Sequence, residues 1–85
     1  MNEQLNFIKQ KIADAVGILF KRKNLSVEQF CKNIGISKTI YYSVINATDN
    51  YSIDSLLKIL MGLDSHLAIF DKQDENIWID KKDNN

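Results

Sequence analysis

The segment 26–46 constrains the fold of this chain most, because it contains two short helix patterns separated by a glycine. Ser26 is a favoured N-cap residue, and Gln29 follows three positions later, as in a capping box. The apolar spacing then predicts a helix over Val27–Ile34. Gly35 comes directly after it, and glycine is the residue that most readily takes the left-handed turn at a helix end.

The second short helix is expected over Lys38–Asn46, with Ser37 as its N-cap. The apolar residues of the two helices and their turn recur where such a pair must contact the body of the domain: Phe30, Ile34, Ile36, Tyr41 and Val44. With Tyr41 and Val44 turned inward, the helical repeat leaves an outer side made of Lys38, Thr39, Tyr42, Ser43 and Asn46.

The remaining elements follow from apolar spacing. A first amphipathic helix is expected over residues 4–22, with an apolar stripe formed by Leu5, Ile8, Ile12, Ala15, Val16 and Leu19. Gly17 inside it costs about 1 kcal/mol relative to alanine, so it is a candidate for a close packing contact. A fourth helix begins after Ser52, and its inward residues are expected to be Ile53, Leu56, Leu57, Leu60 and Leu63.

The chain changes character after this helix. Residues 66–71 and 76–80 are β-rich and are separated by four polar residues, which predicts two short strands joined by a turn, followed by a polar tail. The expected fold is therefore mainly α: a compact four- to five-helix domain over residues 1–64, with a short C-terminal β-strand or hairpin in residues 65–85.

Composition excludes several classes of function. A lone cysteine, Cys31, cannot form an internal disulfide, and with a lone histidine, His66, it cannot build a four-ligand zinc site. No nucleotide-binding loop or nucleophile motif is present, so we expect no enzyme, no cofactor and no metal. The chain shows neither a signal peptide pattern nor a membrane-spanning run, which predicts a cytoplasmic protein.

Charge is unevenly distributed, although the net charge is zero. Residues 1–46 hold seven basic and three acidic side chains, a balance of +4, and the remainder balances at −4. Such a split allows one end to face phosphates while the other repels them, although solvated helix faces can sort in the same way.

The order of these features resembles the helix-turn-helix of phage repressor and Cro proteins, the xenobiotic-response-element family. The matching parts are Ser26, Phe30-Cys31, Gly35-Ile36-Ser37, the helix Lys38–Asn46 and the leucine-rich segment Ser52–Leu63. Two positions depart from the family pattern: Ile45-Asn46-Ala47 replaces Glu-x-Gly, and Cys31 replaces a small alanine, where a structural role is expected.

The resemblance implies a DNA-binding geometry. The second short helix enters the major groove, so base contacts are expected from its outer side: Lys38, Thr39, Tyr42, Ser43 and Asn46. Tyr42 has an alternative role in covering a neighbouring helix. Phosphate contacts are expected from the flanking polar residues, namely Gln29, Lys32, Ser37, Thr48, Asn50 and Tyr51.

The C-terminal residues supply a candidate dimer element. A lone two-stranded hairpin is only marginally stable, so it must cover its own domain or pair with a second subunit. HipB-like antitoxins resemble this chain in carrying a C-terminal strand at a dimer interface. The residues expected at such an interface are Leu67, Ile69, Phe70, Ile77, Trp78 and Ile79.

The leading hypothesis is a sequence-specific repressor that binds a palindromic operator in double-stranded DNA as a homodimer. One alternative is an antitoxin that regulates its own promoter and also binds a toxin, for which Trp78 is a candidate anchor. A third is a protein-interaction module with the same fold that does not bind DNA, such as a phage-encoded inhibitor. The zero net charge and the absence of arginine from Lys38–Asn46 favour this last class.

Overall fold

The computed structural model describes residues 2–47, 50–70 and 76–79, and for Asn2, Phe70 and residues 76–79 it describes the backbone alone. The described elements are α1 (Asn2–Lys21), α2 (Val27–Ile34), α3 (Lys38–Asn46), α4 (Ile53–Gly62), β1 (Ala68–Phe70) and β2 (Asn76–Ile79). The chain is mainly helical, as expected, and both short helices have the predicted bounds.

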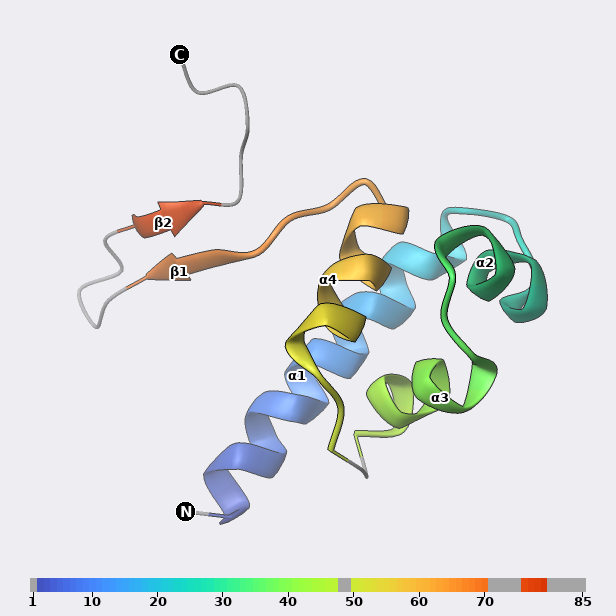
Figure 1. Cartoon of the computed structure of the whole chain (residues 1–85). Coiled ribbons are helices and arrows are strands. Elements are labelled where there is room, and N and C mark those ends of the chain that lie inside the picture. The colour runs from blue at the N-terminus through green and yellow to red at the C-terminus, as the bar shows by residue number, and fades with distance from the viewer. Residues whose placement is uncertain (1, 48–49, 71–75, 80–85) are drawn as a thin grey trace.

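The long helix α1 and the shorter α4 form the centre of the molecule (Figure 1). Helices α2 and α3 lie on one side of this pair, and the β1–β2 hairpin extends from the other side. The hairpin is antiparallel and pairs Ala68 with Ile79, Ile69 with Trp78 and Phe70 with Asn76, with an irregularity between Ile69 and Phe70. Among the described helices, none is long and apolar enough to cross a membrane.

Serine N-caps fix the starts of the three shorter helices. The Oγ atoms of Ser26, Ser37 and Ser52 each accept a hydrogen bond, 3.1 Å long, from the backbone N–H three residues later. Gly35 ends α2 in the left-handed conformation, with φ of 76°. The Gln29 side-chain amide nitrogen donates to Asn33 Oδ1 at 3.5 Å; the described hydrogen bonds do not include the other half of a capping box, from Ser26 N–H to the Gln29 side chain.

Each of the four described helices contributes residues from one of its sides to the core. Its buried residues are Val16, Phe30, Cys31, Tyr41, Val44, Leu56, Ile59 and Leu63. Three rings form its centre: the Phe20 and Phe30 centroids are 5.3 Å apart, and Tyr41 lies 5.6 and 6.0 Å from them. The inward prediction for Tyr41 and Val44 is confirmed, since they are 3% and 0% exposed.

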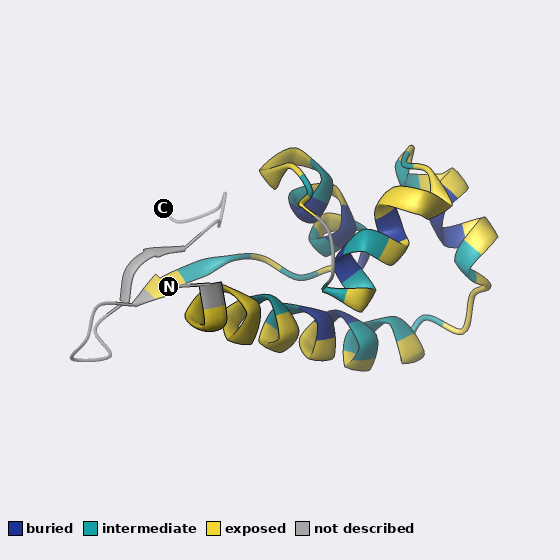
Figure 2. Ribbon diagram, turned by 90° about the horizontal axis from the view of Figure 1, so that it is seen from below, coloured by how far each residue is buried: buried dark blue, intermediate teal, exposed yellow. Residues whose placement is uncertain are grey.

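Two expectations about apolar stripes were wrong in part. Leu5 and Ile8 on the stripe of α1 are half exposed, because the first turns of this helix extend beyond the other helices (Figure 2). On α4, Ile53 is exposed while Ile59, which was not expected inside, is fully buried. Leu56, Ile59 and Leu63 follow the three- and four-residue repeat of a single helix face, whereas Ile53 is the first residue of α4.

The close packing expected at a glycine occurs at Gly62 rather than at Gly17. A Cβ added to Gly17 would meet nothing within 4 Å. A Cβ added to Gly62 would lie 2.5 Å from Ile34 Cγ2 and 3.1 Å from the Phe30 ring. Gly62 therefore allows α2 and α4 to approach each other closely.

Candidate nucleic-acid interface

The outer side of α3 is a short polar surface next to a buried one. Lys38, Thr39, Tyr42 and Asn46 are exposed, and Ser43 is half buried. Because Tyr41 and Val44 fix the rotation of α3 on the core, these five candidate base-contacting residues lie on the side of the helix that faces away from the core.

Two of the five are already engaged within the protein. The Ser43 hydroxyl donates a hydrogen bond to the Thr39 carbonyl oxygen at 3.1 Å, which leaves its oxygen available only as an acceptor. The Tyr42 ring packs edge-on against Tyr41, with centroids 5.5 Å apart, yet Tyr42 remains 44% exposed. Tyr42 thus combines the two roles considered for it, covering a core residue while presenting a flat ring to solvent.

The first turn of α3 differs in charge from those of the other helices. Glu3, Glu28 and Asp54 lie in the first turns of α1, α2 and α4, where a carboxylate interacts favourably with the positive end of the helix dipole. Helix α3 has no acidic residue there and begins with Lys38. A lysine at this position opposes the dipole at a cost of about 0.3–1 kcal/mol. The start of α3 is therefore suited to an external anion.

The expected phosphate-contacting residues near α2 differ in whether their polar groups already make a hydrogen bond within the protein. Gln29 and Lys32 are exposed on α2. The Ser37 hydroxyl oxygen caps α3 by accepting from Ile40 N–H, and its O–H remains available as a donor to a phosphate oxygen.

The loop after α3 is joined to α1 by a lysine that sequence reasoning missed. Lys9 Nζ donates to Asn50 Oδ1 at 3.1 Å and lies 5.7 Å from the centre of the Tyr51 ring. Asn50 is exposed, whereas Tyr51 packs against the core, and burial raises the pKa of Tyr51 above its ordinary value. Thr48 lies outside the described residues. Only the tertiary contact over 41 positions reveals Lys9 as a neighbour of this loop.

Ala47 occupies a backbone conformation that favours glycine. It ends α3 with φ of 56°, in the left-handed region, and its N–H donates to the Val44 carbonyl oxygen.

Cys31 is a buried structural residue. Burial raises the pKa of its thiol, with a smaller opposing effect from Lys38, so the thiol is neutral near pH 7. Among the described residues, no group of three or more histidine, cysteine, aspartate or glutamate side chains could hold a metal ion.

The candidate dimerisation residues are only partly described. Leu67 is half buried and Ile69 is 49% exposed. The side chains of Phe70, Ile77, Trp78 and Ile79 lie outside the described part of the structure.

Comparison of the chain with protein-family models, with curated proteins and with solved structures found no match.

Proposed function

We propose that this protein is a sequence-specific DNA-binding regulator, a repressor-type protein of the cytoplasm that places α3 in the major groove and acts as a homodimer on a palindromic operator. Lys38 donates to guanine O6 and N7, and Asn46 pairs with adenine or holds a phosphate. Thr39 contacts a thymine methyl or donates a hydrogen bond, and Tyr42 packs on sugar or base.

The observation that carries this proposal is that α3 turns a polar side away from the core and has a basic first turn. Tyr41 and Val44 are buried, which leaves a polar outer side, and the first turn of α3 carries Lys38 and no acid, whereas the first turns of α1, α2 and α4 each carry an acid. A local rule that is broken at one place and obeyed elsewhere is typical of a functional site.

Candidate phosphate-contacting residues near α3 support the same orientation. Lys32 is exposed on α2, and Lys9 is adjacent to the exposed Asn50 in the loop after α3. One copy has few such contacts; on the assumption that useful affinity takes about 6–10 phosphate contacts, two copies are needed, on half-sites about one DNA turn apart.

The test is the affinity of Lys38→Ala for an operator selected from random duplexes. We expect this variant to lose about 1–3 kcal/mol of specific binding, measured by fluorescence anisotropy at fixed salt concentration. The matched control is Lys11→Ala, which removes the same charge from the side of α1 that faces away from the core. Equal affinity of the two variants would remove α3 as the element that reads the bases.

A protein-interaction module remains the second candidate, because the net charge is zero and the exposed apolar residues Met61 and Ile53 lie on α4. An antitoxin combines DNA binding and protein binding in one chain. Salt dependence separates the classes: a DNA binder loses affinity linearly in log salt, whereas a pure protein binder shifts no duplex at any salt concentration.

A further inference from the structure

Lys9 occupies a position of α1 that the helical repeat assigns to the core. It begins a row that continues through Ala13, Val16 and Phe20 at steps of four, three and four. Ala13 and Val16 are buried, and Phe20 packs against the core. Lys9 is itself half buried, whereas residues 3–8 before it are exposed. A lysine on such a row keeps its ammonium out of the apolar core by extending it to a polar partner.

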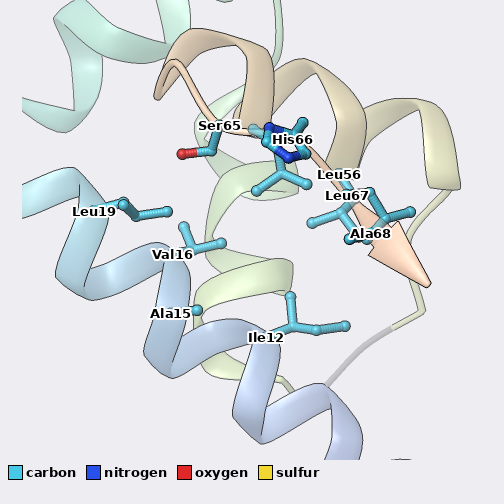
Figure 3. Close-up of a pocket in the computed structure, with 10 residues that line it drawn as sticks. Ile12, Ala15, Val16, Leu19, Leu56, Ser65, His66, Leu67 and Ala68 are labelled. Carbon is cyan, nitrogen blue, oxygen red and sulfur yellow. The ribbon is translucent and has the colours of Figure 1, made fainter. Parts of the chain in front are cut away.

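The partner lies in the loop between α3 and α4. Figure 3 shows that the neighbouring side of α1, which carries Ile12 and Leu19, faces the groove between α1 and α4. Lys9 lies outside that groove: its Nζ donates to Asn50 Oδ1 at 3.1 Å and lies 5.7 Å from the centre of the Tyr51 ring. Lys9 thus connects the first half of α1 to the loop that follows α3.

The chain directly after Asn50 is fixed without Lys9. Tyr51 packs against the core. Ser52 caps α4, because its Oγ accepts from the Ser55 N–H at 3.1 Å. Asn50 therefore precedes two anchored residues, while its own side chain is exposed. The contact with Lys9 is left to determine which way the Asn50 amide points.

A side-chain amide has an acceptor end and a donor end, and the lysine selects between them. An ammonium group has three donors and no acceptor, so it binds the amide oxygen and never the amide nitrogen. The described hydrogen bonds of Asn50 involve Oδ1 and not Nδ2. With Oδ1 held by Lys9, the NH2 group is the end left for an external partner. An amide turned the other way would offer a carbonyl oxygen, which repels an anion.

Two N–H donors beside a positive charge suit a phosphate. Asparagine is among the side chains that donate to the phosphate oxygens of DNA. The bond from the ammonium polarises the amide, which strengthens its N–H groups as donors. Asn50 follows Asn46, the last residue of α3, by four positions, whereas Lys38 begins this helix. A phosphate bound by Asn50 would therefore fix the end of α3 opposite Lys38.

We propose that Lys9 is a positioning residue for DNA binding. It holds the Asn50 amide by its oxygen, and the NH2 group of Asn50 donates to a phosphate oxygen beside the end of α3. Lys9 itself makes no direct contact with DNA. The inference rests on the proposed function, because it assigns how one phosphate contact of that interface is made.

The test is a double-mutant cycle on the affinity for the selected operator, measured by fluorescence anisotropy. Lys9→Met keeps most of the aliphatic stem and removes the ammonium, and Asn50→Ala removes the amide. Each is expected to weaken binding about tenfold. The double variant is expected to bind no more weakly than either single variant, because both changes remove the same contact.

Lys11→Met is the matched control. The Lys11 ammonium also lies over an aromatic ring, 5.2 Å from the centre of Phe7, and the described contacts do not join it to the loop. A distant charge is screened by salt, so this variant should bind within about twofold of the unaltered chain.

Rescue and salt dependence separate positioning from other roles of Lys9. Lys9→Arg keeps a cationic donor and is expected to retain most of the affinity that Lys9→Met loses. The slope of log affinity against log salt is expected to be the same for Lys9→Met and Lys11→Met. Loss of a direct phosphate contact would instead reduce this slope by about one.

Asn50→Asp serves even if Lys9→Met fails to fold. The exposed aspartate still accepts from Lys9 but has a carboxylate oxygen in place of the NH2 group, so it is expected to weaken binding more than Asn50→Ala does. Undiminished binding by Asn50→Asp, additive losses in the double variant, or a salt slope reduced in Lys9→Met alone would overturn the inference and leave the proposed function standing. Failure of the unaltered chain to bind any duplex would remove the proposed function and the role of Lys9 with it.

Discussion

Ala47 ends α3 in a strained backbone conformation. Its φ of 56° lies in the left-handed region, which glycine adopts freely and residues with a Cβ adopt at a cost. We expect Ala47→Gly to raise the free energy of unfolding by about 1 kcal/mol. Urea denaturation measures this directly, and an unchanged or lower midpoint would contradict it.

Ionisation of Tyr41 makes the stability of the fold depend on pH in the alkaline range. Burial, with smaller contributions from Cys31 and Tyr42, raises the pKa of Tyr41 from 10.0 to about 12. The neutral phenol is therefore favoured in the folded state. This stabilisation is complete below pH 10, the ordinary pKa, and is lost as the pH rises to 12, by about 2–3 kcal/mol in total.

Tyr41→Phe tests this dependence. The variant has no phenol to ionise, so its free energy of unfolding should fall less between pH 10 and 12 than that of the unaltered chain. The measurement is a series of urea titrations across this range, with Tyr42→Phe as the control at the exposed neighbouring ring. Parallel curves for Tyr41→Phe and the unaltered protein would show that the Tyr41 hydroxyl ionises as freely in the fold as in the unfolded chain.

At the scale of elements, two glycines inside helices should respond in opposite directions to alanine. Gly62→Ala brings a methyl group 2.5 Å from Ile34 Cγ2. A branched carbon on a packed helix cannot move aside freely, so we expect about 1–3 kcal/mol of destabilisation. Gly17→Ala meets nothing within 4 Å and should stabilise the fold by about 1 kcal/mol. Thermal melts of the two variants test this expectation. A shift of the melting temperature in the same direction for both variants would contradict the packing of α2 on α4.

The same elements show what local sequence can and cannot predict. The bounds of α2 and α3 follow from Ser26, Gly35 and Ser37, because caps act within one helical turn. The exposure of Leu5 and Ile8 does not follow from their spacing, since an apolar stripe has the same pattern whether its own chain or another one covers it.

Some features of the candidate site could likewise be predicted from the sequence, and others could not. The outer residues of α3 were predictable from its inward pair, Tyr41 and Val44, by helical geometry alone. The bond between the Ser43 hydroxyl and the Thr39 carbonyl is local, yet spacing does not reveal it. The contact of Lys9 with Asn50 joins residues 41 positions apart, so only the packing of α1 brings it into view.

At the scale of the whole molecule, α2 and α3 lie on one side of the α1–α4 pair and the β1–β2 hairpin lies on the other (Figure 1). The basic first half of the sequence contains α2 and α3, whereas the acidic remainder begins beyond them. Within that first half, α2 and α3 carry Lys32 and Lys38 against Glu28, so most of the basic excess lies on α1 and in the turn after it.

The most direct test of the central claim, that the outer side of α3 reads DNA, is selection of bound duplexes from a random pool by the full-length protein. We expect enrichment of an inverted repeat with half-sites about one helical turn apart. In the same selection, Lys38→Ala should lose the preference at the guanine that Lys38 contacts and keep the remaining positions. Recovery of no common sequence, or of the same sequence with equal strength by Lys38→Ala, would contradict the claim.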